Sequence, residues 1–150
     1  MSRPSPPRTA TNAPSATLLV RIAVGSIFVS EGIQKFLFED ALGVGRFAKI
    51  GIPMPGVMAP FVGVVEIVCG ALVLGGLLTR LASLPLVIDM LVAVGSTKIP
   101  ILIKSGFWAM AHEARTDFAM LLGCIFFALV GAGPLSLDAR LAGAGKRDDG

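Results

Sequence analysis

Residues 56–97 decide the fold, and they read GVMAPFVGVVEIVCGALVLGGLL, TR and LASLPLVIDMLVAVGST in turn. The apolar segments 56–78 and 81–97 are each close to the roughly 20 residues that an α-helix needs to cross a bilayer. Thr79 and Arg80 leave room for a tight turn only, so the two helices are expected to lie antiparallel. This stretch therefore predicts a transmembrane helical hairpin.

Two further apolar segments extend the hairpin on either side. Residues 16–38 are expected to form the first span and 115–131 the fourth, which could begin as early as Ala109. The linkers 39–55 and 98–114 carry glycine and proline residues that end helices, and aromatic residues typical of a membrane surface. The sequence therefore predicts an all-α integral membrane protein, an antiparallel four-helix bundle with both termini on one side.

The composition supports a membrane protein and excludes other classes. Of the 150 residues, 54% are hydrophobic and 15% are charged, with a mean hydropathy of +0.80. In soluble domains, roughly 45–50% of the residues are apolar and about 25% are charged. The net charge of +3 fits basic residues that flank the spans and meet anionic lipids, so no nucleic-acid partner is expected. The polar residues 1–15 and 143–150 are expected to form disordered tails, which leaves 16–142 as the membrane domain.

The orientation depends on a small charge difference. If the N-terminus is cytoplasmic, six Lys and Arg residues lie on the inner side and five on the outer side. The positive-inside rule then favours cytoplasmic termini at both ends. Arg21 interrupts the first apolar run, which argues against a cleaved signal peptide. Its side chain is expected to reach the inner membrane surface or to meet a polar group of another span.

Four acidic side chains lie within or beside the apolar segments, one for each predicted span: Glu31, Glu66, Asp89 and Asp117. The helix rise places the first three about 10–15 Å from the outer ends of their spans, and Asp117 near the outer end of its span. A carboxylate in hydrocarbon costs several kcal/mol unless it is paired, protonated or solvated in a cavity. We therefore expect the four to converge in the outer half of the bundle.

Gln34 and Lys35 complete this candidate polar cluster. Lys35 stands one helical turn after Glu31, so the two can pair. Small residues surround Glu66 on its helix face, which favours close helix approach. Two interpretations stay open. The charges can neutralise each other and fix the helix register, or the cluster can form a pocket for a proton, a quinone or a small polar molecule. No residue is assigned a catalytic role.

Several redox groups are not expected within this chain alone. No Cys-x-x-Cys pair is present for a dithiol relay, and Cys69 and Cys124 are expected to be packing residues. His112 is the single histidine, which excludes ligation of haem by two histidines of this chain. The Glu-x-x-His pairs of di-iron bundles are also missing. We therefore expect no metal site and no cofactor held by this chain, with quinone as the candidate ligand.

The order of several motifs resembles the DoxX family. These motifs are RIAVG at 21–25, EGIQKF at 31–36, RFAKIGIPMPG at 46–56, the glycine-rich segment 60–80 and GPLSLD at 133–138. The resemblance covers residues 16–142. It implies a small multi-pass protein with four spans, located in the bacterial inner (plasma) membrane.

The family name derives from a membrane subunit linked to thiosulfate:quinone oxidoreductase and to a terminal quinol oxidase complex. The resemblance therefore implies a membrane subunit or partner of a quinone-linked redox complex, in which catalysis depends on another protein. The alternatives are a non-catalytic membrane scaffold or assembly partner, and a small-solute or proton pathway. Transporters often contain inverted repeats. The segments 16–78 and 81–131 show no convincing repeat of each other, which argues against the pathway alternative. Beyond the lipid bilayer, the expected partners are a redox protein and further copies of this chain.

Overall fold

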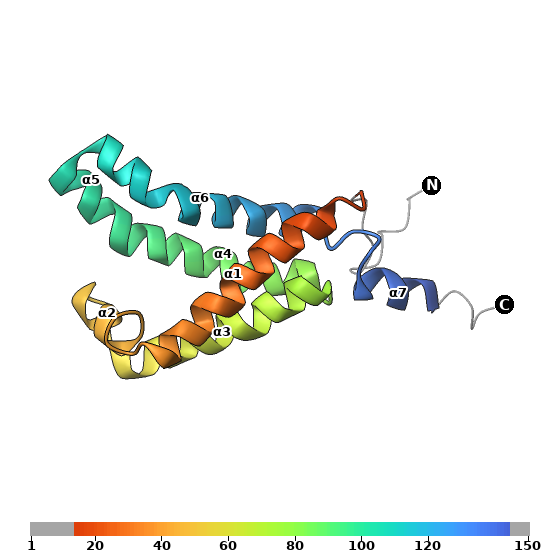
Figure 1. Ribbon diagram of the computed structural model, residues 1–150, viewed down its shortest axis with the longest axis horizontal. Helices are drawn as coiled ribbons and strands as arrows, with labels where there is room; N and C mark the ends of the chain where they lie inside the picture. The colour runs from red at the N-terminus through yellow and green to blue at the C-terminus, as the bar shows by residue number, and fades with distance from the viewer. Residues whose placement is uncertain (1–13, 145–150) are drawn as a thin grey trace, which may run out of the picture.

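The computed structural model describes residues 14–144, and all regular elements in this range are helical. They are α1 (Thr17–Leu37), α2 (Val44–Lys49), α3 (Pro55–Gly75), α4 (Thr79–Ala93), the π-helical turn η1 (Val94–Lys98), α5 (Ile99–Ser105), α6 (Phe107–Val130) and α7 (Leu137–Ala144). The long helices alternate in direction, so α1 begins and α6 ends at the same end of the bundle (Figure 1). The expected all-α membrane bundle is confirmed. The expected disordered tails fall largely on 1–13 and 145–150, outside the described residues. Gly143 and Ala144 were expected in the C-terminal tail, but they lie in α7.

Three helices of the described part are long and apolar enough to cross a membrane. They are α1, α3 and the continuous helix Thr79–Ser105, which comprises α4, η1 and α5. α6 has 24 residues, and at about 1.5 Å per residue it reaches about 36 Å. Its length is therefore sufficient to cross a bilayer, although its first half carries several charged side chains.

The expected linker 98–114 is wrong, because the chain stays helical on both sides of Gly106. Pro100 directly follows the π-helical turn η1, and such a local adjustment can satisfy the backbone groups that a proline leaves free. The chain reverses at Gly106, whose φ of 83° suits glycine, and α6 begins at Phe107. α5 and the start of α6 thus form a second hairpin, at the end of the bundle opposite α7 (Figure 1).

The first hairpin turns slightly earlier than expected, at Gly76–Leu78 in place of residues 79–80. Gly76 (φ 70°) ends α3 in the left-handed conformation that commonly terminates helices. The carboxylate of Asp138 accepts hydrogen bonds from the backbone N–H groups of Leu78 and Thr79, at 2.8 and 3.2 Å. A residue of the closing segment therefore caps the start of α4.

Small residues bring α1 and α3 into close contact along their length. A side-chain carbon added at Gly32 would lie 2.6 Å from the carbonyl oxygen of Gly63. One added at Gly70 would lie 2.9 Å from Cβ of Phe28. Helices in membranes associate closely through such small residues, so the expected small-residue face around Glu66 is a helix contact.

Gly32→Ala is expected to destabilise the protein by about 1–3 kcal/mol, because the added methyl group would push α1 and α3 apart. Gly56→Ala is the matched control: Gly56 also lies in a helix, and nothing lies within 4 Å of its missing side chain. It should be neutral or stabilise by up to about 1 kcal/mol. Equilibrium unfolding in mixed micelles measures both. Equal effects at the two positions would contradict the close approach of the helices.

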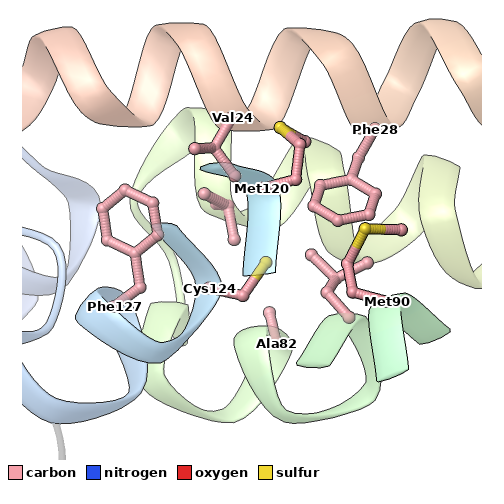
Figure 2. Packing of buried hydrophobic residues seen from close by; sticks show 9 residues of the cluster. Val24, Phe28, Ala82, Met90, Met120, Cys124 and Phe127 are labelled. Atoms are coloured by element: carbon pink, nitrogen blue, oxygen red, sulfur yellow. The ribbon is translucent and has the colours of Figure 1, made fainter. Parts of the chain in front are cut away.

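The apolar core fills the middle of the bundle (Figure 2). Val24 and Phe28 of α1 point toward Met120 and Cys124 of α6, and all four side chains are buried. α1 and α6 touch at this level, where a side-chain carbon added at Gly123 would lie 2.7 Å from Val24. Cys124 is a free thiol within this core, which agrees with its expected packing role.

The helices separate toward the end opposite α7. In Figure 1, α1 and α3 run together to one side, while α4 and α6 run together to the other. A projection can shorten a separation but cannot create one, so this divergence is real. The helices therefore lie further apart near α2 and α5, which we call the open end, than near α7, which we call the closed end.

Candidate functional site

A cavity of about 580 Å³ lies between the diverging helices at the open end. α1, α3, α4, η1 and α6 all contribute to its wall, together with α2 and its flanking loops. Five of the six residues of the predicted polar cluster line it: Glu31, Lys35, Glu66, Asp89 and Asp117. The structure thus gathers most of these residues around one space.

Lys35 forms its ion pair with Glu66, across the α1–α3 contact. The Lys35 Nζ to Glu66 Oε2 distance is 2.5 Å, and the two side chains are 13% and 3% exposed. The expected pairing of Lys35 with Glu31 on the same helix is therefore wrong. Glu66 is buried beside α1 whereas Glu31 is exposed at the cavity rim. A buried carboxylate has more to gain from a cationic partner than an exposed one.

Asp89 of α4 brings a second carboxyl group to the same point. It lies within hydrogen-bonding reach of Glu66 and interacts electrostatically with Lys35. Its Oδ2 atom is buried and receives no hydrogen bond from the described residues. Two carboxylates and one ammonium leave one negative charge, which a proton held between the carboxyl groups would neutralise. We call Lys35, Glu66 and Asp89 the triad.

Asp117 of the cavity wall forms a second ion pair. Its Oδ2 is 2.8 Å from Nζ of Lys98, and the side chains are 26% and 10% exposed. Lys98 belongs to η1, so this contact joins the π-helical turn to α6. π-helical turns within α-helices occur frequently at functional sites.

Gln34 lies outside the cavity wall. It donates a hydrogen bond to the hydroxyl of Ser30 at 2.9 Å, on the exposed side of α1. Among residues 14–144, no three His, Cys, Asp or Glu side chains gather into a group that could hold a metal ion. The predicted cluster thus divides into the triad, the rim residue Glu31, the Asp117 ion pair and the separate Gln34.

Sequence reasoning missed several lining residues. Arg46 and Phe47 of α2 line the cavity, whereas residues 39–55 were expected to form a linker with residues typical of a membrane surface. Glu113 also lines the cavity; it was expected in a linker and lies in α6. Lys98, the partner of Asp117, was expected in the same linker and lies in the continuous helix Thr79–Ser105. The apolar run around Pro100 could have indicated this helix.

Arg21 closes the opposite end of the bundle. Its guanidinium donates hydrogen bonds to four backbone carbonyls, those of Val73 (3.1 Å), Leu74 (3.0 Å), Ala132 (3.0 Å) and Leu135 (2.7 Å). The residue is 3% exposed. Of the two expectations for Arg21, contact with polar groups of another span is the correct one. The last carbonyls of a helix lack hydrogen-bond donors within the helix. The Arg21 guanidinium donates to two such carbonyls at the end of α3.

The comparisons with known proteins agree with this architecture. The sequence model of the DoxX family matches residues 16–109. The protein named "Uncharacterized membrane protein Rv3486" from Mycobacterium tuberculosis is 53% identical over 135 residues, which cover 86% of this chain and 83% of that protein. "Putative oxidoreductase CatD" from Bacillus subtilis is 32% identical over 122 residues, 81% of this chain and 84% of that protein. No solved structure matches significantly. The chain therefore belongs to the DoxX family, as its motif order predicted.

Proposed function

We propose that this protein is a membrane subunit of a quinone-linked oxidoreductase complex, and that its cavity holds the head group of the quinone. The observation that carries the proposal is the triad of Lys35, Glu66 and Asp89 on the cavity wall, in which Glu66 is buried. Ionisable groups within a membrane bundle are expensive to bury, and they commonly mark functional sites. The name of the Bacillus relative, "Putative oxidoreductase CatD", supports the redox class.

The proposed location is the bacterial inner membrane with both termini cytoplasmic. α1 begins and α6 ends at the same end of the bundle (Figure 1), which supports an even number of crossings. Three helices of the described part qualify as spans by length and apolarity, and α6 is the proposed fourth crossing. The Lys98–Asp117 ion pair reduces the cost of placing Asp117 within it. In this orientation the cavity opens in the outer half of the bilayer.

The cavity residues fit a quinone head group. The volume of about 580 Å³ falls within the range of roughly 300–1,000 Å³ that is typical of small-molecule sites. A quinone carries two carbonyl oxygens, and Lys35 can donate a hydrogen bond to one of them. Reduction turns these oxygens into hydroxyl groups, and Asp89 Oδ2 is a buried acceptor without a donor among the described residues. The triad therefore suits both the oxidised and the reduced head group.

A quinone takes up two electrons and two protons to become a quinol. The carboxyl groups of Glu66 and Asp89 can hold a proton beside the head group and exchange it through the open end of the cavity. Cys69 and Cys124 are both free thiols on different helices. The electrons would therefore come from a flavin, haem or iron–sulfur group of a partner subunit.

The closed end argues against the pathway alternative. The core cluster around Phe28, Leu86 and Phe127 fills the bundle beneath the cavity, with each side chain at most 1% exposed. Arg21 then joins the helix ends below this core. A cavity with one closed end supports a binding site, while a scaffold without a ligand stays the rival interpretation.

Binding of a short-chain ubiquinone to the protein in lipid nanodiscs tests the proposal. We expect saturable binding, with Lys35→Met and Glu66→Gln each weakening it at least about tenfold, because each loses a charged hydrogen-bonding group. Lys49→Met and Glu39→Gln are matched controls, since both residues are exposed and lie outside the cavity wall. They should leave the affinity within about twofold.

Affinity purification from native membranes provides a second readout. A partner with flavin, haem or iron–sulfur absorption should be retained and should reduce or oxidise the added quinone. If the wild type binds no quinone, or if the triad variants bind it as well as the wild type does, the proposal is wrong. The scaffold interpretation would then account better for the buried charges.

A further inference from the structure

We infer that the quinone enters the cavity sideways from the bilayer, between α1 and α6, and leaves its isoprenoid tail in that gap. This inference rests on the proposed function and adds the route and the kind of tail that the site accepts. It follows from where the cavity wall reaches the outside of the bundle.

The wall opens between α1 and α6 beyond the contact of Val24 with Gly123. From that contact the two helices diverge (Figure 1), and both continue to line the cavity. On α1, Ile27 lines the cavity and is 37% exposed. On α6, Thr116 and Glu113 line the cavity and are exposed as well. These exposed lining residues stand on two diverging helices, and we place the opening between them.

The inner part of this opening lies at the depth of hydrocarbon. Ile27 is ten residues from either end of α1, which places it about 15 Å from each end of the helix. Met120 is ten residues from the end of α6, at a comparable depth. The hydrocarbon core of a bilayer is about 30 Å thick, so this part of the opening faces lipid tails. A ligand that enters there must dissolve in the bilayer.

The lining changes from apolar to charged along the same path. Phe28, Met90 and Met120 form an apolar surface at the middle of the bundle, and methionine side chains adapt easily to an irregular chain. Lys35 and Glu66 lie on the side toward the open end. This order matches a molecule with a polar head and a long apolar tail. A small water-soluble ligand would not need the apolar part.

Tryptophan substitutions test the route in nanodiscs with two probes, decylubiquinone and its analogue without a tail. We expect Ile27→Trp to weaken decylubiquinone binding about tenfold, which corresponds to the lost burial of roughly two methylene groups. The analogue without a tail should bind within about twofold of its wild-type affinity. Ile33→Trp is the matched control, because Ile33 is 43% exposed on the same helix and lies outside the cavity wall.

A rival route lies beside α4, where Val92 lines the cavity and is 51% exposed. A tail-specific loss with Val92→Trp but not with Ile27→Trp would overturn the inference in favour of that route. An equal loss for both probes with Ile27→Trp would also overturn it, because the substitution would then obstruct the head group. In each of these outcomes the proposed function survives. Absence of binding by the wild type would instead remove the proposed function and this inference together.

Discussion

Glu66→Leu is expected to destabilise the protein by about 3 kcal/mol, measured by equilibrium unfolding in mixed micelles. Breaking a buried ion pair by removing one partner typically costs about 3–5 kcal/mol, because the remaining charge stays buried. The Lys35 side chain is 13% exposed, so it would be left in that position. Asp89 also interacts electrostatically with Lys35, so the remaining ammonium keeps one carboxylate neighbour. The expected loss in unfolding free energy therefore lies at the lower end of this range.

The contribution of Asp89 can be separated by a second substitution. Adding Asp89→Asn to Glu66→Leu removes the remaining carboxylate, and the total cost should approach the upper end of about 3–5 kcal/mol. Glu39→Leu is the control, since an exposed position should change the unfolding free energy by less than about 0.5 kcal/mol. A cost for Glu66→Leu as small as that of the control would contradict the buried ion pair.

Glu66→Gln distinguishes a functional triad from a structural one. Glutamine keeps the shape and a hydrogen-bonding group but loses the carboxylate, so the fold should be retained with a smaller loss of stability than Glu66→Leu causes. Under the proposed function, quinone-linked activity of the complex is lost in this variant. If both variants retain activity while their thermal stability changes, the triad serves the fold alone.

The depth of the site could be predicted from the sequence, because depth depends on the regular rise of a helix. Residues 56–78 were expected to span the membrane, and the structure has α3 at Pro55–Gly75. Counting along such helices placed Glu31, Glu66 and Asp89 at one level, and all three line the cavity. The rotation of one helix about its axis relative to another depends on packing. Lys35 therefore pairs with Glu66 across a glycine contact, whereas the four-residue spacing on one helix had indicated Glu31 as its partner.

The α5–α6 hairpin could not be predicted, because proline and glycine are ambiguous in membrane helices. Neighbouring helices and local π-helical adjustments can satisfy the backbone groups that a proline leaves free. Pro100 follows such a turn, η1, which also contains Lys98, the ion-pair partner of Asp117. The four hydrogen bonds of Arg21 could not be predicted either, because two of their acceptors lie 111 and 114 residues further along the chain.

Arg21→Met is expected to cost about 3–5 kcal/mol and to loosen the closed end. Hydrogen bonds from a charged donor contribute about 1.5–3 kcal/mol each, and some of the four carbonyls would recover water near the membrane surface. Arg21→Lys should be intermediate, because an ammonium cannot reach several carbonyls at once as the planar guanidinium does. Arg140→Met, at an exposed position of α7, is the control and should stay within about 0.5 kcal/mol. Proteolysis of the segment around Ala132 and Leu135, which Arg21 anchors, should accelerate in Arg21→Met.

The two ends of the bundle should contribute independently to stability. Arg21 and Lys35 are 14 residues apart on α1, or about 21 Å along the helix, and they share no partner among the described residues. Effects at such a distance usually add within about 0.3–0.5 kcal/mol. The double variant Arg21→Lys/Glu66→Gln should therefore lose the sum of the two single losses. The Arg21→Lys variant should also bind quinone with wild-type affinity. A loss well below the sum, or weaker quinone binding in Arg21→Lys, would show that the closed end controls the geometry of the triad.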